Sequence, residues 1–376
     1  TYDKESISWR FLRPKTSTFE IDKDFLFGDM IASWVMRDVQ DGNPIPSPEI
    51  RAEIQRESRG IRNGNHGKPI LWYDMLATSA SNPRDEWRSG PYTNMLGDVP
   101  VILTCGASAW PDAWLYGIQE RIRDGVAGFY LDLSGWRSCS NRLHGCGYYD
   151  ADGSVRASLP FLAQREFMLT LQKMIKENDR DGVIVYHGAS PMTQWSDVHI
   201  EGESWQYAKD YSTLSPEYYQ LLMSNRDETG SMPCFYSVLV YRHVPGCQKS
   251  KVTQEDAVGL ALLHGQHCFN LHDIEFYGNY ITTKPLLDFG VDAPDSEWIP
   301  YWKNPLSKYP EGSLAVSSWR RNGRELLVIF NLSSDTPAYF ELGERTAVDH
   351  FKGAGTISGT VEVAPRSLQI LEWDCQ

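Results

Sequence analysis

The sequence lacks the features that define several large functional classes. No stretch approaches the roughly 20 consecutive apolar residues that a membrane span needs, so no transmembrane helix is expected. It contains no phosphate-binding P-loop, no dinucleotide fingerprint and no G-x-S-x-G nucleophile elbow. Nucleotide-dependent chemistry and serine-hydrolase chemistry are therefore poor interpretations, and no cofactor is expected.

Positive charge is also scarce. The chain has 36 Lys and Arg against 49 Asp and Glu, which gives a formal net charge of −13. Without a basic stripe, nucleic acid is not an expected partner. Aromatic residues are abundant instead, with 13 Trp and 19 Tyr. Aromatic faces stack on the C–H faces of sugar rings, which favours a carbohydrate ligand, although large barrels bury many aromatic side chains in any case.

Cysteine is too rare for a disulfide scaffold, with seven residues in 376. One or two bridges are compatible with the spacing, and the odd count leaves at least one thiol free or in an intermolecular pair. Cys139, His144 and Cys146 lie close together in one segment. A disulfide, such as Cys139–Cys146, and a zinc site both stay open. The C-x4-H-x-C spacing is unusual for zinc and no fourth ligand is nearby in the sequence, so no metal is expected.

Alternating strand and helix patterns fill the first three hundred residues. Apolar runs predict parallel strands at residues 7–12, 25–34, 69–75, 126–133, 183–187, 197–203, 234–241 and 267–271. Segment 99–104 is strand-like and is interpreted as a connection on the rim. Helical periodicity predicts helices at 49–59, 109–124, 159–177, 216–223 and 253–265, the last with Thr253 as N-cap and Asp256 in a capping box. Eight such units predict a (β/α)8 barrel, with a doubly wound open sheet as the alternative.

The pattern changes near residue 312. Short strands without helices are predicted at 314–319, 326–331, 338–342, 360–363 and 367–373, as in an antiparallel β-sandwich. We therefore expect a barrel domain at residues 1–302 and a C-terminal β-sandwich domain at 303–376. Because the chain begins with Thr-Tyr-Asp and not with Met, we also expect a processed product with more sequence upstream.

Several predicted strands end in polar residues, and active sites of (β/α)8 enzymes lie at the carboxyl ends of the strands. Asp132 ends the fourth strand, and Glu201 and Glu203 end the sixth. Glycoside hydrolysis needs two carboxylates, about 5–5.5 Å apart for retention and about 6.5–9.5 Å apart for inversion. We expect Asp132 and Glu203 to be catalytic, with Glu201 as the alternative to Glu203. The other residues predicted to bind substrate are Trp34, Trp72, Asp74, Trp136, Asn141, His144, Tyr148, His187, Trp205, Tyr241, His272 and Asp273.

Four motifs together resemble a bacterial family related to glycoside hydrolase family 123. They are GFYLD at 128–132, CSNRLHGCGY at 139–148, QREFM at 164–168 and EGESW at 201–205. The resemblance covers residues 70–280 and implies a secreted glycosidase with an upstream β-sandwich, a barrel and a C-terminal β domain. The positions that it carries over are Asp132, Asn141, His144, Gly145, Cys146, Tyr148, His187 and Glu203.

One departure from family 123 bears on the mechanism. That family resembles substrate-assisted enzymes with an adjacent Asp-Glu pair acting on N-acetylgalactosamine, whereas Leu133 follows Asp132 here. We therefore expect a retaining hydrolase of poly- or oligosaccharides. The alternatives are a substrate-assisted N-acetylhexosaminidase and an inactive carbohydrate-binding or structural barrel. A secreted, periplasmic or cell-surface location is expected, and the oligomeric state stays open.

Overall fold

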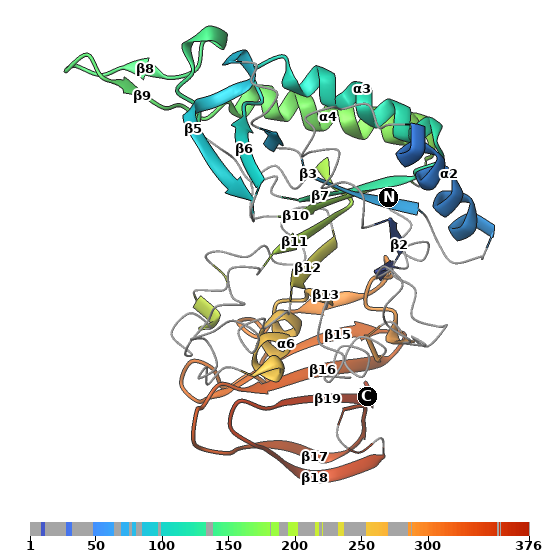
Figure 1. Ribbon diagram of the computed structural model, residues 1–376. Coiled ribbons are helices and arrows are strands. Elements are labelled where there is room, and N and C mark those ends of the chain that lie inside the picture. The colour runs from blue at the N-terminus through green and yellow to red at the C-terminus, as the bar shows by residue number, and fades with distance from the viewer. Residues whose placement is uncertain are drawn as a thin grey trace. The chain divides into compact units, whose positions relative to one another are not determined.

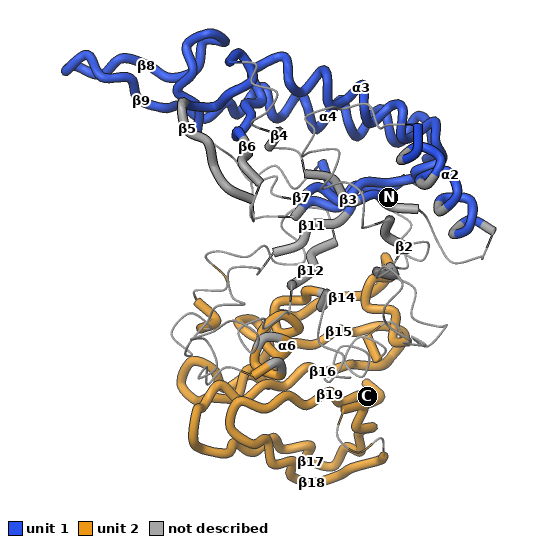
Figure 2. Tube along the Cα trace, viewed as in Figure 1, with its two compact units in different colours: residues 1–199 blue, residues 200–376 orange. Residues whose placement is uncertain are grey.

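The computed structural model describes the chain in separate stretches. The described residues are 9–11, 28–31, 48–63, 69–74, 77–79, 85–96, 99–132, 138–180, 182–187, 195–201, 215–217, 220, 232–236, 253–269, 285–286, 288–351, 353 and 355–375. They fall into two compact units, residues 1–199 and 200–376 (Figure 2). The domain boundary predicted between residues 302 and 303 lies inside the second unit, and that division stays a prediction.

Eight short strands follow one another in chain order in one sheet (Figure 1). Every ladder of this sheet whose register is defined is parallel. Each strand lies in or overlaps a segment predicted as a barrel strand. Among the described residues no ladder joins the last strand to the first, so the closed barrel stays a prediction. The strands are β1 (Trp9–Phe11), β2 (Gly28–Ile31), β3 (Pro69–Asp74), β7 (Gly128–Asp132), β10 (Val183–His187), β11 (Val198–Glu201), β12 (Met232–Tyr236) and β13 (His267–Phe269).

The central strands of the first unit pair closely because their side chains are apolar and one position is glycine. Phe129 and Leu131 on one face of β7 have no exposed surface and Tyr130 on the other face is only 2% exposed, as expected for a parallel strand covered on both faces. Gly128 begins β7, and a Cβ there would lie only 2.5 Å from the carbonyl oxygen of Val183. Gly128 is the register partner of Val183 on β10, so a larger residue would push the two strands apart.

Three helices of the first unit form where amphipathic segments were predicted. They are α2 (Pro48–Asn63), α3 (Trp110–Arg123) and α4 (Phe161–Asn178). Helices α3 and α4 run side by side (Figure 1), and the rings of Trp114 and Phe167 meet edge to face with centroids 5.2 Å apart. Their apolar faces share one core with β3, β7 and β10. No helix in the described stretches is long and apolar enough to cross a lipid bilayer.

A smaller sheet and a folded loop accompany the parallel strands of this unit. Strands β4 (Ala77–Ser79), β6 (Val99–Thr104) and β5 (Arg88–Leu96) form an antiparallel sheet in the order β4-β6-β5, so segment 99–104 stands outside the parallel sheet, as predicted. The loop after β7 contains the 3-10 turn η3 (Arg142–His144) and the hairpin of β8 (Tyr148–Tyr149) and β9 (Val155–Arg156). A backbone bridge between Cys139 and Ser158 closes its base.

The second unit contains the antiparallel sheet that the C-terminal pattern predicts. Six strands pair in the order β14-β15-β16-β19-β17-β18. Every defined ladder between them is antiparallel. The strands are β14 (Glu297–Ile299), β15 (Leu314–Arg321), β16 (Arg324–Asn331), β17 (Ala338–Asp349), β18 (Thr356–Val363) and β19 (Leu368–Asp374).

Helix α6 (Gln254–Leu263) covers one face of this sheet. It begins after its predicted N-cap, Thr253, whose side chain and that of Asp256 complete the predicted capping box. A Cβ at Gly259 would lie 2.4 Å from the ring of Phe330, so the helix packs directly on β16. The helix and the C-terminal sheet therefore share one hydrophobic core.

The other face of the sheet is covered by part of the sheet itself. Phe340 and Leu342 of β17 pack with Val316 of β15 and Ile329 of β16, although the hydrogen-bond partners of β17 are β18 and β19. The sheet thus folds across itself and encloses a core, as a sandwich does. In the described residues it is one six-stranded sheet, where the sequence predicted a two-layered sandwich.

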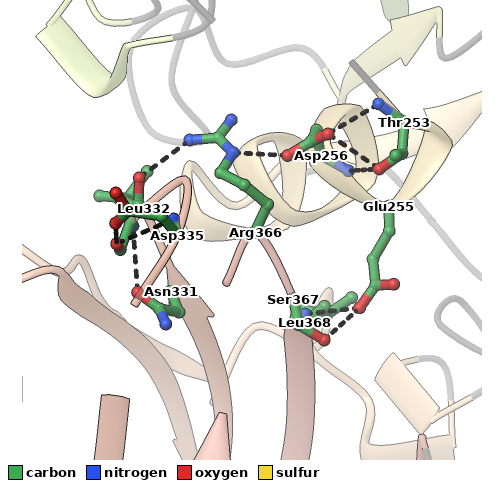
Figure 3. Close-up of polar contacts among 10 residues, drawn as sticks. Thr253, Glu255, Asp256, Asn331, Leu332, Asp335, Arg366, Ser367 and Leu368 are labelled. Carbon is green, nitrogen blue, oxygen red and sulfur yellow. Dashed lines mark hydrogen bonds and ion pairs between the residues drawn. The ribbon is translucent and has the colours of Figure 1, made fainter. Parts of the chain in front are cut away.

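A buried ion pair fastens α6 to the turn before β19 (Figure 3). The Nε atom of Arg366 donates to Oδ1 of Asp256 at 2.6 Å, and the two side chains are 8% and 0% exposed. The other oxygen of Asp256 accepts hydrogen bonds from the backbone N–H and the hydroxyl of Thr253. Next to it, Glu255 accepts the backbone N–H of Leu368 at 2.7 Å. One turn of helix thus holds two carboxylates that bind the sheet.

Removing the cation of this pair should destabilise the second unit strongly. Arg366→Met leaves the Asp256 carboxylate buried without its cation, and we expect a loss of about 3–5 kcal/mol in the free energy of unfolding. Arg321→Met is the matched control, because its partner Asp295 is 55% exposed and stays hydrated; we expect at most about 1 kcal/mol. Urea denaturation followed by fluorescence measures both. Equal losses in the two variants would contradict the importance given to the buried pair.

His264, which follows α6, should make stability depend on pH. Burial lowers the pKa of His264 to about 4, and its Nδ1 lies 2.8 Å from the carbonyl oxygen of Leu260. In the unfolded chain a histidine has a pKa near 6.5. Between these values the unfolded chain binds a proton that the folded chain does not, so the free energy of unfolding falls as the pH falls, by about 1.4 kcal/mol per pH unit.

His264→Phe keeps an aromatic ring beside Tyr301, whose centroid lies 5.4 Å away, and removes the titrating group. Urea denaturation at pH 7 and pH 5 should show a smaller loss for this variant than for the natural sequence. The difference expected between the two proteins is on the order of 2 kcal/mol at pH 5. If both proteins lose the same free energy, His264 is not the group responsible.

Candidate functional site

Three strands of the first unit end in polar residues at the same edge of the parallel sheet. Asp74 is the last residue of β3 and Asp132 the last of β7, and the two are partners in register. Tyr186 is the partner of Leu131, and His187, the next residue, ends β10. Neighbouring strands lie about 4.8 Å apart, so the backbones of these polar residues are close together. The strand ends predicted from the sequence are therefore brought to one edge.

The other predicted site residues are placed less fully. Glu201 is the last residue of β11, and Trp72 lies within β3. For these two residues, and for Asp74, Asp132 and His187, the structure describes the position along the strand. The roles of all of them stay predictions. Seven predicted residues lie outside the described residues: Trp34, Trp136, Glu203, Trp205, Tyr241, His272 and Asp273.

Asn141 holds the loop after β7 in place. Its amide nitrogen donates to the carbonyl oxygens of Asp85 and Arg88 at 2.7 and 2.9 Å, and its amide oxygen accepts the N–H of Leu143 at 2.9 Å. The last contact caps η3, a role that suits the short amide side chain. The loop is thereby tied to the start of β5. A contact of Asn141 with substrate stays a prediction, and the contacts described make it a positioning residue.

Three cysteines and one histidine lie close together where this loop meets the end of β6. Cys105, Cys139 and Cys146 are buried free thiols, and His144 is half-buried beside them. One potential ligand atom from each of the four residues lies within 4.8 Å of all the others. The Sγ atoms of Cys105 and Cys146 are 3.7 Å apart, far beyond the roughly 2.05 Å of a disulfide. Cys139 and Cys146 are themselves free thiols, so the disulfide considered between them is wrong.

The thiols of this cluster perturb one another. A hydrogen bond from the Cys105 thiol lowers the pKa of Cys139, and the same bond together with burial raises the pKa of Cys105. Burial raises the pKa of Cys146. Cys139 is therefore the sulfur best prepared to carry negative charge. The signal missed in the sequence is Cys105, which lies 41 residues before Cys146 and directly follows β6.

Tyr148 lies on the exposed hairpin of the loop. Tyr148 is 56% exposed, and its neighbour Tyr149 is 64% exposed. The guanidinium of Arg142 lies 5.5 Å from the Tyr149 ring centroid, which restrains that ring. Two exposed aromatic rings on one hairpin offer a surface for stacking. The sequence pointed to Tyr148 through its motif and missed Tyr149, which follows it directly.

A small cavity lies between Cys105 and helices α3 and α4. Trp110, Trp114 and Phe167 contribute to its walls. Its volume of about 20 Å³ has room for roughly one water molecule. A sugar ring is far larger, so this cavity is not a substrate site.

Comparisons with known proteins show which solved structures have a similar fold. No family model matches the chain, and no curated protein sequence matches it. Among solved structures, an alpha-glucosyl transfer enzyme has a TM-score of 0.54 at 12% identity, over 93% of this chain and 92% of its own. A noncanonic maltogenic alpha-amylase from Thermotoga neapolitana has a TM-score of 0.53 at 11% identity, over 87% and 82%.

A third solved structure is also similar to this chain. It is a candidate alpha-N-acetylgalactosaminidase from Bacillus halodurans C-125, with a TM-score of 0.51 at 13% identity over 93% of this chain and 88% of its own. At such identities the similarity concerns the fold alone. The chain has a glycoside-hydrolase-like fold, and the specific relation to family 123 stays a prediction.

Proposed function

We propose that this chain is a retaining glycoside hydrolase of poly- or oligosaccharides. Asp132 is the nucleophile, and Glu203 is the general acid and base, with Glu201 as the alternative. The ionised aspartate attacks the anomeric carbon while the protonated glutamate donates to the leaving oxygen; the glutamate then takes a proton from the water that releases the sugar. In this proposal the eight parallel strands close into a (β/α)8 barrel and the C-terminal antiparallel sheet is a second domain.

The observation that carries the proposal is the position of Asp132 at the end of a buried strand. Phe129 and Leu131 of the same strand are fully buried, and Asp74 is its register neighbour on β3. Carboxylates are costly to bury, so an acid that ends such a strand is expected where the sheet meets solvent. The carboxyl ends of parallel strands carry the catalytic groups in (β/α)8 enzymes. Because the fold is glycoside-hydrolase-like, we propose that the catalytic groups lie at this edge of the sheet.

Aromatic rings and surface charge support a carbohydrate substrate. Tyr148 and Tyr149 are exposed on the loop that follows the strand of Asp132, and exposed tyrosines can stack on sugar faces. The net charge of −13 disfavours polyanionic substrates. We therefore propose a neutral or amino sugar at the cleaved bond.

The pairing of Asp74 with Asp132 favours a second candidate, a substrate-assisted N-acetylhexosaminidase. Such an enzyme uses the acetamido oxygen of the substrate as nucleophile, with one carboxylate to orient the amide and another as acid. Family 123 takes these from consecutive residues, and here two carboxylates stand on neighbouring strands in register. The similarity to a candidate alpha-N-acetylgalactosaminidase is consistent with this candidate.

The proposal extends to location and partners. We propose that the enzyme works outside the cytoplasm, as a secreted, periplasmic or cell-surface protein, because polymeric sugars are met there. An upstream β-sandwich domain or chain is its proposed partner. Cell fractionation with an antibody to this chain tests the location, and recovery in the cytoplasmic fraction would contradict it.

Replacing the proposed catalytic carboxylates should abolish turnover. With a panel of chromogenic aryl glycosides, we expect Asp132→Asn and Glu203→Gln each to lower kcat by about 10²–10⁴-fold or more, because each amide can neither attack nor transfer a proton. Asp295→Asn is the control, since Asp295 is 55% exposed in the second unit, and should leave kcat unchanged. Circular dichroism verifies the fold. Full activity in either carboxylate variant would remove that residue from the catalytic role.

The two candidate mechanisms differ in their need for an acetamido group. A retaining enzyme that uses Asp132 as nucleophile should cleave 2-hydroxy sugars, and Asp132→Gly should form a glycosyl azide when azide is added. A substrate-assisted enzyme should cleave only 2-acetamido sugars and should lose at least about tenfold in kcat in both Asp74→Asn and Asp132→Asn. Binding of glycans without cleavage of any substrate in the panel would favour an inactive carbohydrate-binding barrel.

A further inference from the structure

The cluster of Cys105, Cys139, His144 and Cys146 lies outside the proposed chemistry. The four residues come from two separated segments: Cys105 directly follows β6, and the other three belong to the loop after β7. Their potential ligand atoms all lie within 4.8 Å of one another. We propose that these four residues bind a structural zinc ion.

The distances in the cluster fit tetrahedral coordination. Zn–S bonds of about 2.3 Å and a Zn–N bond of about 2.0–2.1 Å at tetrahedral angles require S···S edges of about 3.8 Å and an S···N edge of about 3.6 Å. The Sγ atoms of Cys105 and Cys146 are 3.7 Å apart. The imidazole of His144 lies beside these sulfurs, with its Nε2 3.8 Å from Sγ of Cys139, and its Nδ1 is the nitrogen offered to the ion. A central ion therefore needs only small adjustments of the side chains.

The histidine is arranged as a metal ligand usually is. Its Nε2 lies 3.3 Å from the carbonyl oxygen of Arg88, and its Nδ1 is buried without a hydrogen-bond partner in the described part of the chain. Metal-binding histidines commonly donate one ring N–H to a backbone carbonyl and offer the other nitrogen to the ion. An unpartnered buried nitrogen costs free energy that coordination would recover.

Backbone and charge around the sulfurs suit thiolates. The N–H of Ala107 donates to Sγ of Cys105 at 3.4 Å. Arg142 donates to the carbonyl oxygen of Cys146 at 3.1 Å, which brings a positive charge beside the cluster. Three thiolates, one neutral imidazole and Zn²⁺ carry a net charge of −1, and this guanidinium would offset it. The three thiol protons leave to solvent on binding.

Two glycines explain how His144 and Cys146 reach the same point. Gly145 has φ +80° and Gly147 has φ +77°, in the left-handed region that favours glycine. A Cβ at Gly147 would lie 2.7 Å from the carbonyl oxygen of Arg156. The H-G-C-G run is thus a tight turn that presents an imidazole and a thiol together. The single residue between the two ligands, unusual for a zinc motif, is accommodated by this turn.

The ligand types select the metal and its role. Soft thiolates with one imidazole and no carboxylate suit zinc, whereas magnesium, calcium and manganese prefer oxygen ligands. With four protein ligands the coordination sphere is full, so no position remains for water or substrate and the site is structural. Its effect is to join the end of β6 to the loop that follows the strand of Asp132.

Metal analysis of the protein purified without added metal tests the proposal directly. We expect about one zinc per chain by mass spectrometry, and loss to background in Cys139→Ser and Cys146→Ser. Cys375→Ser is the matched control, because Cys375 is an exposed cysteine outside the cluster and should leave the zinc content unchanged. Zinc retained by a folded Cys139→Ser variant, or absent from the natural protein even after refolding with zinc, would overturn the proposal.

Cobalt substitution distinguishes this site from incidental binding and does not depend on the variants folding. Refolding the natural protein with Co²⁺ should give the intense visible bands of a tetrahedral ion and a near-ultraviolet thiolate-to-cobalt band. Zinc should displace the cobalt stoichiometrically and abolish both. A weak octahedral spectrum would contradict three-thiolate binding. Neither measurement involves glycosidase activity, so failure here leaves the proposed enzyme function untouched.

Discussion

The close parallel pairing of β7 with its neighbours is the constraint on which the first unit depends. A parallel sheet needs apolar cover on both faces, and β7 contributes Phe129 and Leu131 to one face and Tyr130 to the other, all buried. Gly128 lets the backbone of β10 approach, since a Cβ there would meet the Val183 carbonyl oxygen. A slip by one residue would turn Phe129 and Leu131 toward the face that Tyr130 now fills and would disrupt the packing on both faces. The same register therefore places Asp132 beside Asp74, and packing decides which carboxylates are neighbours.

The strands and helices could be predicted because their signals are local. The runs VAGFYLDL and VIVYH are apolar over a strand's length, and Thr253 and Asp256 form a capping box three residues apart, as expected. Strand-end residues such as Asp132 and His187 follow from the same patterns. What could not be predicted depends on distant contacts. Cys105 lies beside Cys146 although 41 residues separate them, and residues of β17 pack against β15, which is not its hydrogen-bond partner. The spacing of Cys139 and Cys146 suggested a disulfide because Cys105, the fourth member of the cluster, is far from them in the sequence.

The loop after β7 carries both the proposed zinc ligands and the exposed tyrosines proposed to contact sugar, and neither proposal depends on the other. Asn141 ties it to the carbonyls of Asp85 and Arg88, and His144 lies near the same Arg88 carbonyl. A long loop costs conformational entropy, and crosslinks that close it reduce the freedom of the unfolded chain. A bound zinc would add a crosslink between β6 and the segment that carries Tyr148. Residues of the HGCGY motif that resemble a substrate-binding signature thus have a structural explanation of their own.

In the second unit, helix α6 and the C-terminal sheet depend on each other for their packing. The change from helical to β patterning near residue 312 is real, since the long antiparallel strands begin with β15 at Leu314, after the short β14. Yet α6, which belongs to the alternating part of the sequence, packs its Gly259 against Phe330 and its Asp256 against Arg366. The helix would expose that core, and a buried carboxylate would lose its cation, if the C-terminal sheet were removed. The C-terminal sheet is therefore part of what folds the end of the alternating region, and cutting the chain at residue 303 would unfold α6 as well as remove the sheet.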